Sequence, residues 1–326
     1  MGFLDHSEFC TELKQVTMDS QEPGMTESEK SQCRALLGSI QWRVLQTAPH
    51  HAAKLSWLQS ALPRGDKETV NQVNKLCREV FASRHLSVGI KDLQACGPED
   101  LCMVAWTDAG VGNRPDMTST GGYLIALANK SILNGVRGPI TPIAWRSGKL
   151  ARVAKSSLSA EVQALSEGEQ ELMMCRAELA ELLGYALDLR RPELTTQRIE
   201  AAIIVDAKSV YDAVQKGETA SAAYSMKEKY AALELMSVAE NMRKQATRLL
   251  WVSSEAQLAD GLTKSSAQEM LRVFLLKNQE WNVKFDPEFL AAKKKKHRTP
   301  PEEDFPPEPE FESRPDMTWS DLIQQT

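Results

Sequence analysis

Apolar residues in the first quarter of the chain recur at the three- and four-residue spacing of an α-helix. Residues 26–29 (TESE) form a capping box that opens the first helix, and Pro49 ends it because its ring cannot continue the helical hydrogen bonds. Further helices are predicted over residues 50–62 and 68–83. Residues 26–95 are therefore expected to form a small helical unit.

Beyond this unit, the pattern changes to short apolar runs that are typical of buried strands, and amphipathic helices alternate with the later runs. Strands are predicted at 101–106, 122–128, 140–145, 201–205 and 249–252, and helices at 161–183, 206–216, 222–245 and from 256 onward. The order is β-β-β-α-β-α-β-α, a meander followed by alternation. It predicts an α/β fold over residues 100–266, with helices packed on a mixed five-stranded sheet.

Composition permits a packed core, because 42% of the residues are hydrophobic and 25% are charged. No run of about 18 apolar residues occurs and no secretory signal is recognisable, so we expect no membrane contact and an intracellular, cytoplasmic or nuclear, location. The six cysteines contain no C-x-x-C pair, which favours reduced thiols over a zinc site or a disulfide framework.

The formal charge of −5 is unevenly distributed. Residues 299–326 hold eight acidic residues and one basic residue, which leaves +2 for the rest of the chain. Six prolines in this acidic tail predict disorder, and its protein partner is unknown. Residues 267–298 are predicted to be a helical extension and basic linker, whose run at 293–298 (KKKKHR) is either a nuclear-import or nucleic-acid patch or a solvated helix end. Residues 1–25 carry no pattern that assigns them.

Four carboxylates occupy comparable places in this pattern. Asp108 and Asp206 each end a predicted strand, whereas Glu161 and Asp260 each lie in the first turns of a predicted helix. Singly, such residues are most often turn formers, helix caps or partners of the helix dipole. Strand ends and helix starts can converge on one edge of a sheet, however, and a cluster of carboxylates is tolerable only if cations neutralise it. Hard oxygen ligands of this kind suit Mg²⁺ or Mn²⁺.

Six segments, in this order, resemble the ribonuclease H domain of copia-type LTR retrotransposon polyproteins. They are WTDAG at 106–110, STGGY at 119–123, IAWRS at 143–147, SSLSAEVQALS at 156–166, VDAKS at 205–209 and WVSSEAQLADGLTK at 251–264. Residues 36–42 (LLGSIQW) also resemble the segment that links reverse transcriptase to ribonuclease H in such polyproteins. No Asp-Asp dipeptide occurs, so we expect no polymerase palm in this chain, which looks like the C-terminal fragment of such a polyprotein.

The resemblance implies a Mg²⁺-dependent endonuclease that cuts the RNA strand of RNA–DNA hybrids with two metal ions, for which Mn²⁺ is a possible substitute. Asp108 would bridge both ions, and Asp260 would help to hold the ion that activates the attacking water. Glu161 and Asp206 would help to hold the ion at the leaving 3′-oxygen. The chemistry agrees, because two ions roughly 4 Å apart stabilise both ends of an in-line displacement at phosphorus. Selectivity for RNA needs contact with the 2′-hydroxyl.

A strip of four cations precedes the long helix at every third residue, and no acid interrupts it in the sequence. The strip consists of Arg146, Lys149, Arg152 and Lys155. It is either a solvated loop or a surface that follows the phosphates of a nucleic acid. Ser157 and Ser159 favour the second interpretation, because they lie where the N–H groups of a helix N-terminus attract anions. Ser209 is a further candidate for a contact with the nucleic-acid backbone.

Departures from the family weaken the catalytic interpretation. Ala207 stands where the family usually has Asn after the third acid, and no histidine lies between His85 and His297. Two alternatives to an enzyme are therefore kept: a nucleic-acid-binding remnant of the same fold, and a structural remnant whose tail recruits a partner. The retention of all four acids favours the enzyme.

Overall fold

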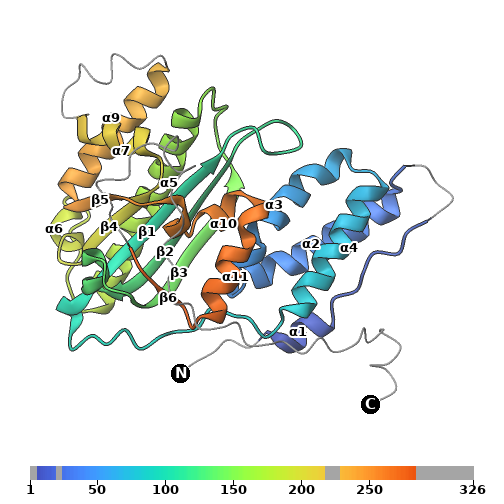
Figure 1. Cartoon of the computed structure of the whole chain (residues 1–326), viewed down its shortest axis with the longest axis horizontal. Coiled ribbons are helices and arrows are strands. Elements are labelled where there is room, and N and C mark those ends of the chain that lie inside the picture. Colours follow the sequence, from blue (N-terminus) through green and yellow to red (C-terminus); the bar gives the residue numbers. More distant parts are fainter. Residues whose placement is uncertain (1–5, 20–23, 217–227, 284–326) are drawn as a thin grey trace, which may run out of the picture. The chain divides into compact units, whose positions relative to one another are not determined.

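The computed structural model describes residues 6–19, 24–216 and 228–283, and a six-stranded sheet lies at its centre (Figure 1). The strands are β1 (Leu101–Gly110), β2 (Thr120–Asn129), β3 (Gly138–Lys149), β4 (Glu200–Val205), β5 (Thr247–Trp251) and β6 (Glu280–Trp281). Their order across the sheet is β5-β4-β1-β2-β3-β6. β2 is antiparallel to β1 and β3, whereas β4 is parallel to β1 and β5. The predicted α/β class with a mixed sheet is thus confirmed.

The sheet has one strand more than the five predicted. β6 pairs two residues with Gly138 and Pro139 at the start of β3. Two residues are too few to show a hydrophobic period, so the sequence pattern could not reveal this strand. The buried Gln279 holds the segment in place, because its side-chain amide donates to the carbonyls of Gly89 and Ile140 at 2.8 and 3.0 Å.

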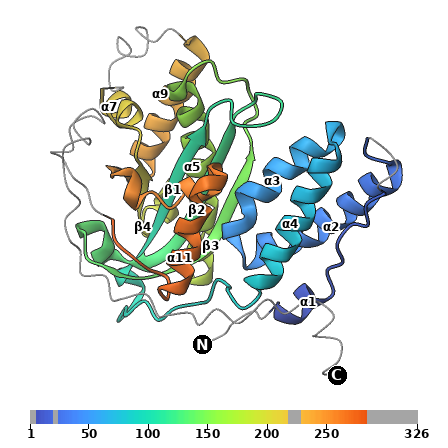
Figure 2. The same ribbon diagram turned by 45° about the vertical axis from the view of Figure 1, so that its right-hand side comes forward.

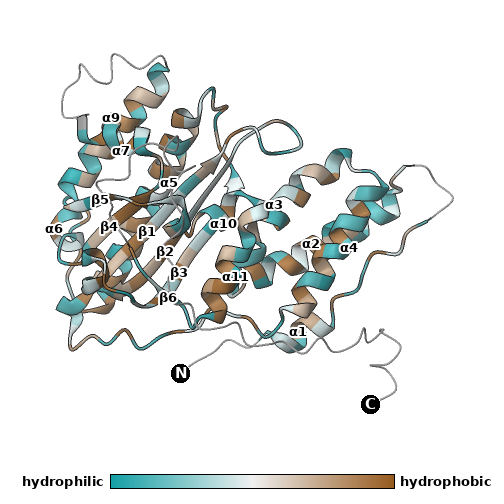
Figure 3. Ribbon diagram, viewed as in Figure 1, coloured by the Kyte–Doolittle hydropathy of each residue, from teal (hydrophilic) through white to brown (hydrophobic). Residues whose placement is uncertain are grey.

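Each face of the sheet is covered by helices (Figure 2). Helices α5 (Ser157–Leu182), α7 (Lys208–Lys216) and α9 (Lys229–Lys244) pack on one face, and α10 (Asp260–Thr263) and α11 (Gln268–Leu276) pack on the other. Because side chains alternate along a strand, Met103 and Ala105 of β1 join the first core, while Cys102, Val104 and Trp106 join the second. Figure 3 shows hydrophobic residues gathered along these central strands.

Three helices lie in the region of the predicted helical unit, namely α2 (Glu27–Gln46), α3 (Ala52–Ala61) and α4 (Lys67–Ala82), and the short α1 (Ser7–Thr11) precedes them. The capping box forms, with the Glu29 N–H donating to Thr26 Oγ1 at 3.2 Å and the Thr26 N–H donating to the Glu29 carboxylate at 2.8 Å. The unit shares one hydrophobic core with the α10–α11 face of the sheet. Trp145 Nε1 of β3 also donates to the Val44 carbonyl of α2 at 2.8 Å.

Short elements complete the described chain. They are η1 (Pro49–His51), η2 (Leu62–Arg64), η3 (Pro98–Asp100), η4 (Lys130–Asn134), α6 (Glu193–Thr196), η5 (Ser254–Ala256) and η6 (Ser265–Ala267). The helix predicted to begin at residue 256 is therefore interrupted, because η5, α10, η6 and α11 follow one another there. The helix predicted over 222–245 is described from Lys229 onward.

β1 and β3 each extend four residues beyond their predicted ends. The parallel ladder between β1 and β4 ends at Trp106, but β2 continues to pair with β1 as far as Gly110. Asp108 therefore lies within a strand and not at its end. Similarly, β3 continues to Lys149, so Arg146 and Lys149 lie on a strand and not in a loop. The cause is the same in both cases: the β2 backbone supplies hydrogen-bond partners beyond the apolar runs.

Some predicted segments lie outside the described residues, namely the acidic tail at 299–326 and the basic run at 293–298. Within the described ranges, no helix combines the length and hydrophobicity that crossing a lipid bilayer requires.

Arg114, in the loop between β1 and β2, joins the helical unit to the sheet. The side chain is buried, and its guanidinium donates to the Ser56 carbonyl at 3.2 Å and to the Ser60 hydroxyl, both on α3. Its Nε donates to Thr120 Oγ1 of β2 at 3.1 Å. A buried guanidinium is stable only when several acceptors surround it, so these bonds fix α3 over the hairpin that carries Asp108.

Replacing Arg114 by Met should lower the free energy of unfolding by roughly 1–3 kcal/mol, because buried Thr120 and the half-buried acceptors of α3 lose their donor. Arg137→Met is the matched control, since Arg137 is exposed and pairs only at the surface with Glu280. That control should change stability by less than about 1 kcal/mol. Urea denaturation of both variants measures the difference, and equal effects would show that Arg114 does not join the two parts.

Candidate metal centre

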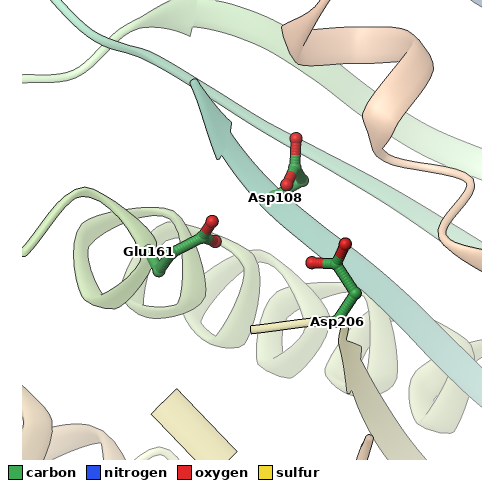
Figure 4. Close-up of side chains that lie close together, drawn as sticks. All are labelled: Asp108, Glu161 and Asp206. Atoms are coloured by element: carbon green, nitrogen blue, oxygen red, sulfur yellow. The ribbon is translucent and has the colours of Figure 1, made fainter. Parts of the chain in front are cut away.

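Asp108, Glu161 and Asp206 lie together, although they come from β1, α5 and the end of β4 (Figure 4). One carboxylate oxygen of each lies within 4.8 Å of those of the other two. Asp108 is buried, and the other two acids are half-buried. The three side chains point toward one another, so the structure brings three of the four predicted acids to one place.

The unequal ladders of the sheet create this place. β4 stops pairing with β1 at Trp106, which leaves the next carbonyl of β1, that of Thr107, without a strand partner on this side. The buried Gln257 supplies the hydrogen bond that β4 does not, because its Nε2 donates to the Thr107 carbonyl at 2.9 Å. Its Oε1 accepts from the Ala259 N–H at 3.3 Å, just before α10. A single amide therefore ends the open edge of β1 and positions α10 beside Asp108.

Helix α5 brings Glu161 to the sheet. Ser156 caps the helix by accepting the Ser159 N–H at 3.1 Å, and Glu161 follows at the fifth helical residue. Gly168, two turns further on, lies against Thr107, and a Cβ at this position would overlap the threonine methyl group. Glycine therefore allows the close approach of α5 to β1 that places Glu161 opposite Asp108.

Asp206 follows directly after β4, and its backbone is held by β5. Trp251 Nε1 donates to the Asp206 carbonyl at 2.8 Å, and the Val252 N–H donates to the Val205 carbonyl at 3.0 Å. These bonds continue the strand pairing past the last residue of β4. They fix the backbone from which the Asp206 carboxylate projects.

Burial and mutual repulsion make the ionised cluster unfavourable. Burial is the main cause that raises the pKa of Glu161 well above the usual value, and the charges of Asp108 and Asp206 raise it further. Burial likewise raises the pKa of Asp108, although the Lys264 ammonium opposes the shift. The pKa of Asp206 is raised by burial and by Asp108, against a hydrogen bond from Ser254. A bound cation would remove this penalty.

The donor set fits a divalent cation. The three carboxylates are hard oxygen ligands, and their close spacing allows one ion to be shared among them. No cysteine or histidine belongs to this cluster in the described part of the chain, so the chemistry favours Mg²⁺ or Mn²⁺ over a softer metal.

Asp260, the fourth predicted acid, lies beside Asp108 but differs in its partner. Lys264 Nζ lies 2.6 Å from Asp260 Oδ1 and 3.4 Å from Asp108 Oδ2. Thr263 of the same helix donates its hydroxyl to Asp108 Oδ2. α10 can approach this closely because Gly122 of β2 lies beneath it, where a Cβ would be 2.9 Å from Leu262 Cβ. Asp260 thus lies outside the set formed by the other three acids and is paired with a lysine.

The predicted strip of cations is paired in space with acids from other elements. Arg146 lies 3.2 Å from Glu167 of α5, and Lys149 lies 2.8 Å from Asp116 of the β1–β2 loop. Further pairing comes from α9: Arg152 pairs with Glu234, and Glu228, just before the helix, lies near Lys155. The cationic side chains remain about half exposed where they pair, so the strip is accessible but neutralised.

The predicted serines differ in exposure. Ser157 and Ser209 are exposed in the first turns of α5 and α7. Ser159 is buried and its N–H is engaged with Ser156, so Ser156 rather than Ser159 caps the helix. A cavity of about 950 Å³ lies between this helix start and α9. Arg152 and Lys155 line it, whereas its described lining contains none of the four acids.

Four residues of the site were not singled out by sequence reasoning. They are Gln257, Thr263, Lys264 and Asn113, whose Nδ2 donates to the Thr263 carbonyl at 2.8 Å. Three of them lie within the segment 251–264, which carries the clearest resemblance. The resemblance of this segment could therefore have pointed to them. Asn113 lies in a loop, where the sequence gives no indication of the contact.

No protein-family model matches this chain. Similar curated proteins from Arabidopsis thaliana include the retrovirus-related Pol polyprotein from transposon RE1, 22% identical over 251 residues, or 77% of this chain. The corresponding polyprotein from transposon RE2 is 23% identical over 237 residues, or 72% of this chain. This chain spans only 15% and 14% of the lengths of these relatives. It is therefore similar to one region of retroelement Pol polyproteins.

Among solved structures, the foamy viral protease-reverse transcriptase in complex with an RNA/DNA hybrid matches 63% of this chain and 27% of its own. The sequence identity is 11% and the TM-score is 0.33.

Replacing Glu161 by Gln removes one of three like charges and keeps the shape of the side chain. In chelator, the variant should melt about 2–4 °C higher, the shift that roughly 1 kcal/mol gives in a domain of this size. The rise in melting temperature that Mn²⁺ produces in the parent should shrink. Glu178→Gln, at an exposed position of the same helix, should alter neither value. A variant that melts lower in chelator and keeps the full Mn²⁺ response would contradict a shared cation site.

Proposed function

We propose that this chain is a Mg²⁺-dependent ribonuclease that cuts the RNA strand of RNA–DNA hybrids. The observation that carries the proposal is the convergence of Asp108, Glu161 and Asp206 within 4.8 Å at one place on the sheet. The similarity to retroelement Pol polyproteins supports an enzyme-related region, and the segment resemblance supports ribonuclease H in particular.

Asp108, Glu161 and Asp206 would hold one Mg²⁺ or Mn²⁺ ion, and a second would lie between Asp108 and Asp260. When bound, these ions supply Lewis-acid stabilisation of the charge that develops on the reacting phosphodiester. The protein itself orients the ligands. The Thr263 hydroxyl fixes the Asp108 carboxylate, and the Trp251 indole fixes the Asp206 backbone, so neither acid needs to reorganise when substrate arrives.

The strip of Arg146, Lys149, Arg152 and Lys155 is the proposed contact surface for the nucleic-acid backbone. In its ion pairs with Glu167, Asp116 and Glu234 the cations are about half exposed, and pairs that are open to solvent on one side are worth only about 1 kcal/mol. Phosphate groups can therefore replace these acids at little cost. Ser157 and Ser209, exposed at two helix starts, are proposed as further backbone contacts.

A hybrid-binding module without cleavage is the second candidate function. It is favoured by Ala207, which places no hydrogen-bonding side chain beside Asp206 at the start of α7. A protein that had lost substrate-orienting groups could still bind phosphates through the strip.

Asp206→Asn should abolish hybrid cleavage while leaving the fold and hybrid binding nearly intact, because the amide keeps the shape of the carboxylate but not its charge. Loss of one metal ligand should slow cleavage by at least roughly 100-fold, since metal-bound charge stabilisation is worth several kcal/mol. The measurement is cleavage of a labelled hybrid in Mg²⁺, with hybrid affinity measured in Ca²⁺.

Asp212→Asn, an identical substitution at a partly exposed position on α7, is the control and should cleave at the parental rate. Parental cleavage by Asp206→Asn would rule out the proposed site. A parent that binds hybrid but does not cleave it would favour the binding module.

Replacing all four strip cations by Gln should weaken hybrid binding and flatten its salt dependence. If each contacts one phosphate, the slope of log K against log salt should fall by about 3–4. The matched control replaces four exposed cations of the N-terminal helical region, Lys14, Arg34, Lys75 and Arg78, and should leave the slope unchanged. Equal slopes for the parent and the strip variant would mean that the strip is only a solvated surface.

A further inference from the structure

The four acids fall into two groups that differ in their counter-charge. Asp108, Glu161 and Asp206 form the set whose oxygens lie within 4.8 Å of one another, and among the described residues Asp260 is not part of that set. Asp260 is instead paired with the ammonium group of Lys264. Lys264 Nζ lies 2.6 Å from Asp260 Oδ1 and 3.4 Å from Asp108 Oδ2. Asp108 thus belongs to the set that could share a metal ion and also lies beside a resident ammonium group.

The bond between Lys264 and the acids is not an ordinary surface ion pair. The carboxylate side chains of Asp108 and Asp260 are only 1% and 12% exposed, whereas the lysine side chain is 41% exposed. The Lys264 side chain is therefore partly in solvent, while its ammonium group lies beside two buried acids. A lysine amine is ordinarily protonated at neutral pH, so Lys264 brings a positive charge to the two acids.

The local structure directs the lysine toward the site. Lys264 follows α10 directly, and its N–H donates to the Asp260 carbonyl at 3.0 Å, which places the two side chains on one side of the turn. The preceding residue, Thr263, binds Asp108. Asn113 holds this turn in place, because its Nδ2 donates to the Thr263 carbonyl at 2.8 Å.

We propose that Lys264 is a resident cation of the acidic site, which occupies the side between Asp108 and Asp260 and keeps a divalent ion out of it until nucleic acid binds. This inference rests on the proposed metal-dependent function. In the free protein, one divalent ion would then bind at Asp108, Glu161 and Asp206. The partly exposed side chain of Lys264 allows the ammonium to turn toward an incoming phosphate, and its departure would free Asp260 for a second ion.

Electrostatics gives the reason for the exclusion. A divalent ion between Asp108 and Asp260 would have to lie within a few ångströms of the ammonium, and the repulsion between the two cations would oppose its binding. With Lys264 in place, the charge of Asp260 is already neutralised. A second ion would therefore gain less binding free energy there than the first ion gains at Asp108, Glu161 and Asp206. The lysine thus couples metal loading to the arrival of an anionic substrate.

The test counts Mn²⁺ ions bound per chain without nucleic acid, by electron paramagnetic resonance of the free ion. The parent and Lys264→Arg should bind one ion, whereas Lys264→Gln should bind a second ion at least about tenfold more tightly than the parent does. Lys264→Gln should also melt lower than the parent in chelator and recover in Mn²⁺, which shows that it folds. Lys277→Gln, in the turn after α11, is the control and should behave as the parent.

The outcomes separate this inference from the proposed function. Equal Mn²⁺ stoichiometry and affinity in the parent and Lys264→Gln would overturn the role of Lys264. If Asp206→Asn at the same time lost its Mn²⁺, the metal centre itself would stand. If Asp206→Asn bound Mn²⁺ like the parent, the metal centre would fail, whatever Lys264 does.

Discussion

Negative charge concentrated in a place with little water is the constraint on which the rest of the structure depends. Three carboxylates share one small space, and Asp108 is almost wholly buried, so donors and cations must compensate. The surrounding elements provide this compensation. Thr263 supplies a hydroxyl and Lys264 an ammonium group, while Gln257 satisfies the backbone where the strand pairing ends. The unequal lengths of the strand ladders and the close approach of two helices, permitted by glycines, bring these groups together.

Much of the fold could be predicted because hydrophobic periodicity is a local property. The capping box at 26–29, the strand at 201–205 and the long helix all lie within a few residues of their predicted places. The place of Asp108 within a strand could not be predicted in the same way. Whether a strand continues past its apolar run depends on the neighbouring strand, and β2 extends the pairing as far as Gly110. The two-residue β6 is invisible to any periodic pattern.

The same distinction applies to charge. Residue types pointed to the acids, whereas the pairing of the strip depends on tertiary structure. Acids that neutralise it come from α5, from the β1–β2 loop and from α9, and none of them lies between residues 146 and 155. Lys264 was equally hidden, although it is adjacent to Thr263 in the segment that carries the clearest resemblance. Its partners, Asp108 and Asp260, are brought together only by the folded sheet.

The shared core of the helical unit and the sheet also limits how this sequence can evolve. Trp145 and Arg114, both in the sheet-containing part, donate hydrogen bonds to the backbone of α2 and α3. Without the helical unit, these donors would lose their acceptors and one face of the sheet would lose part of its cover. Mutations that separate the two parts would therefore destabilise both, and the segment that must stay intact is longer than the one in which the acids lie.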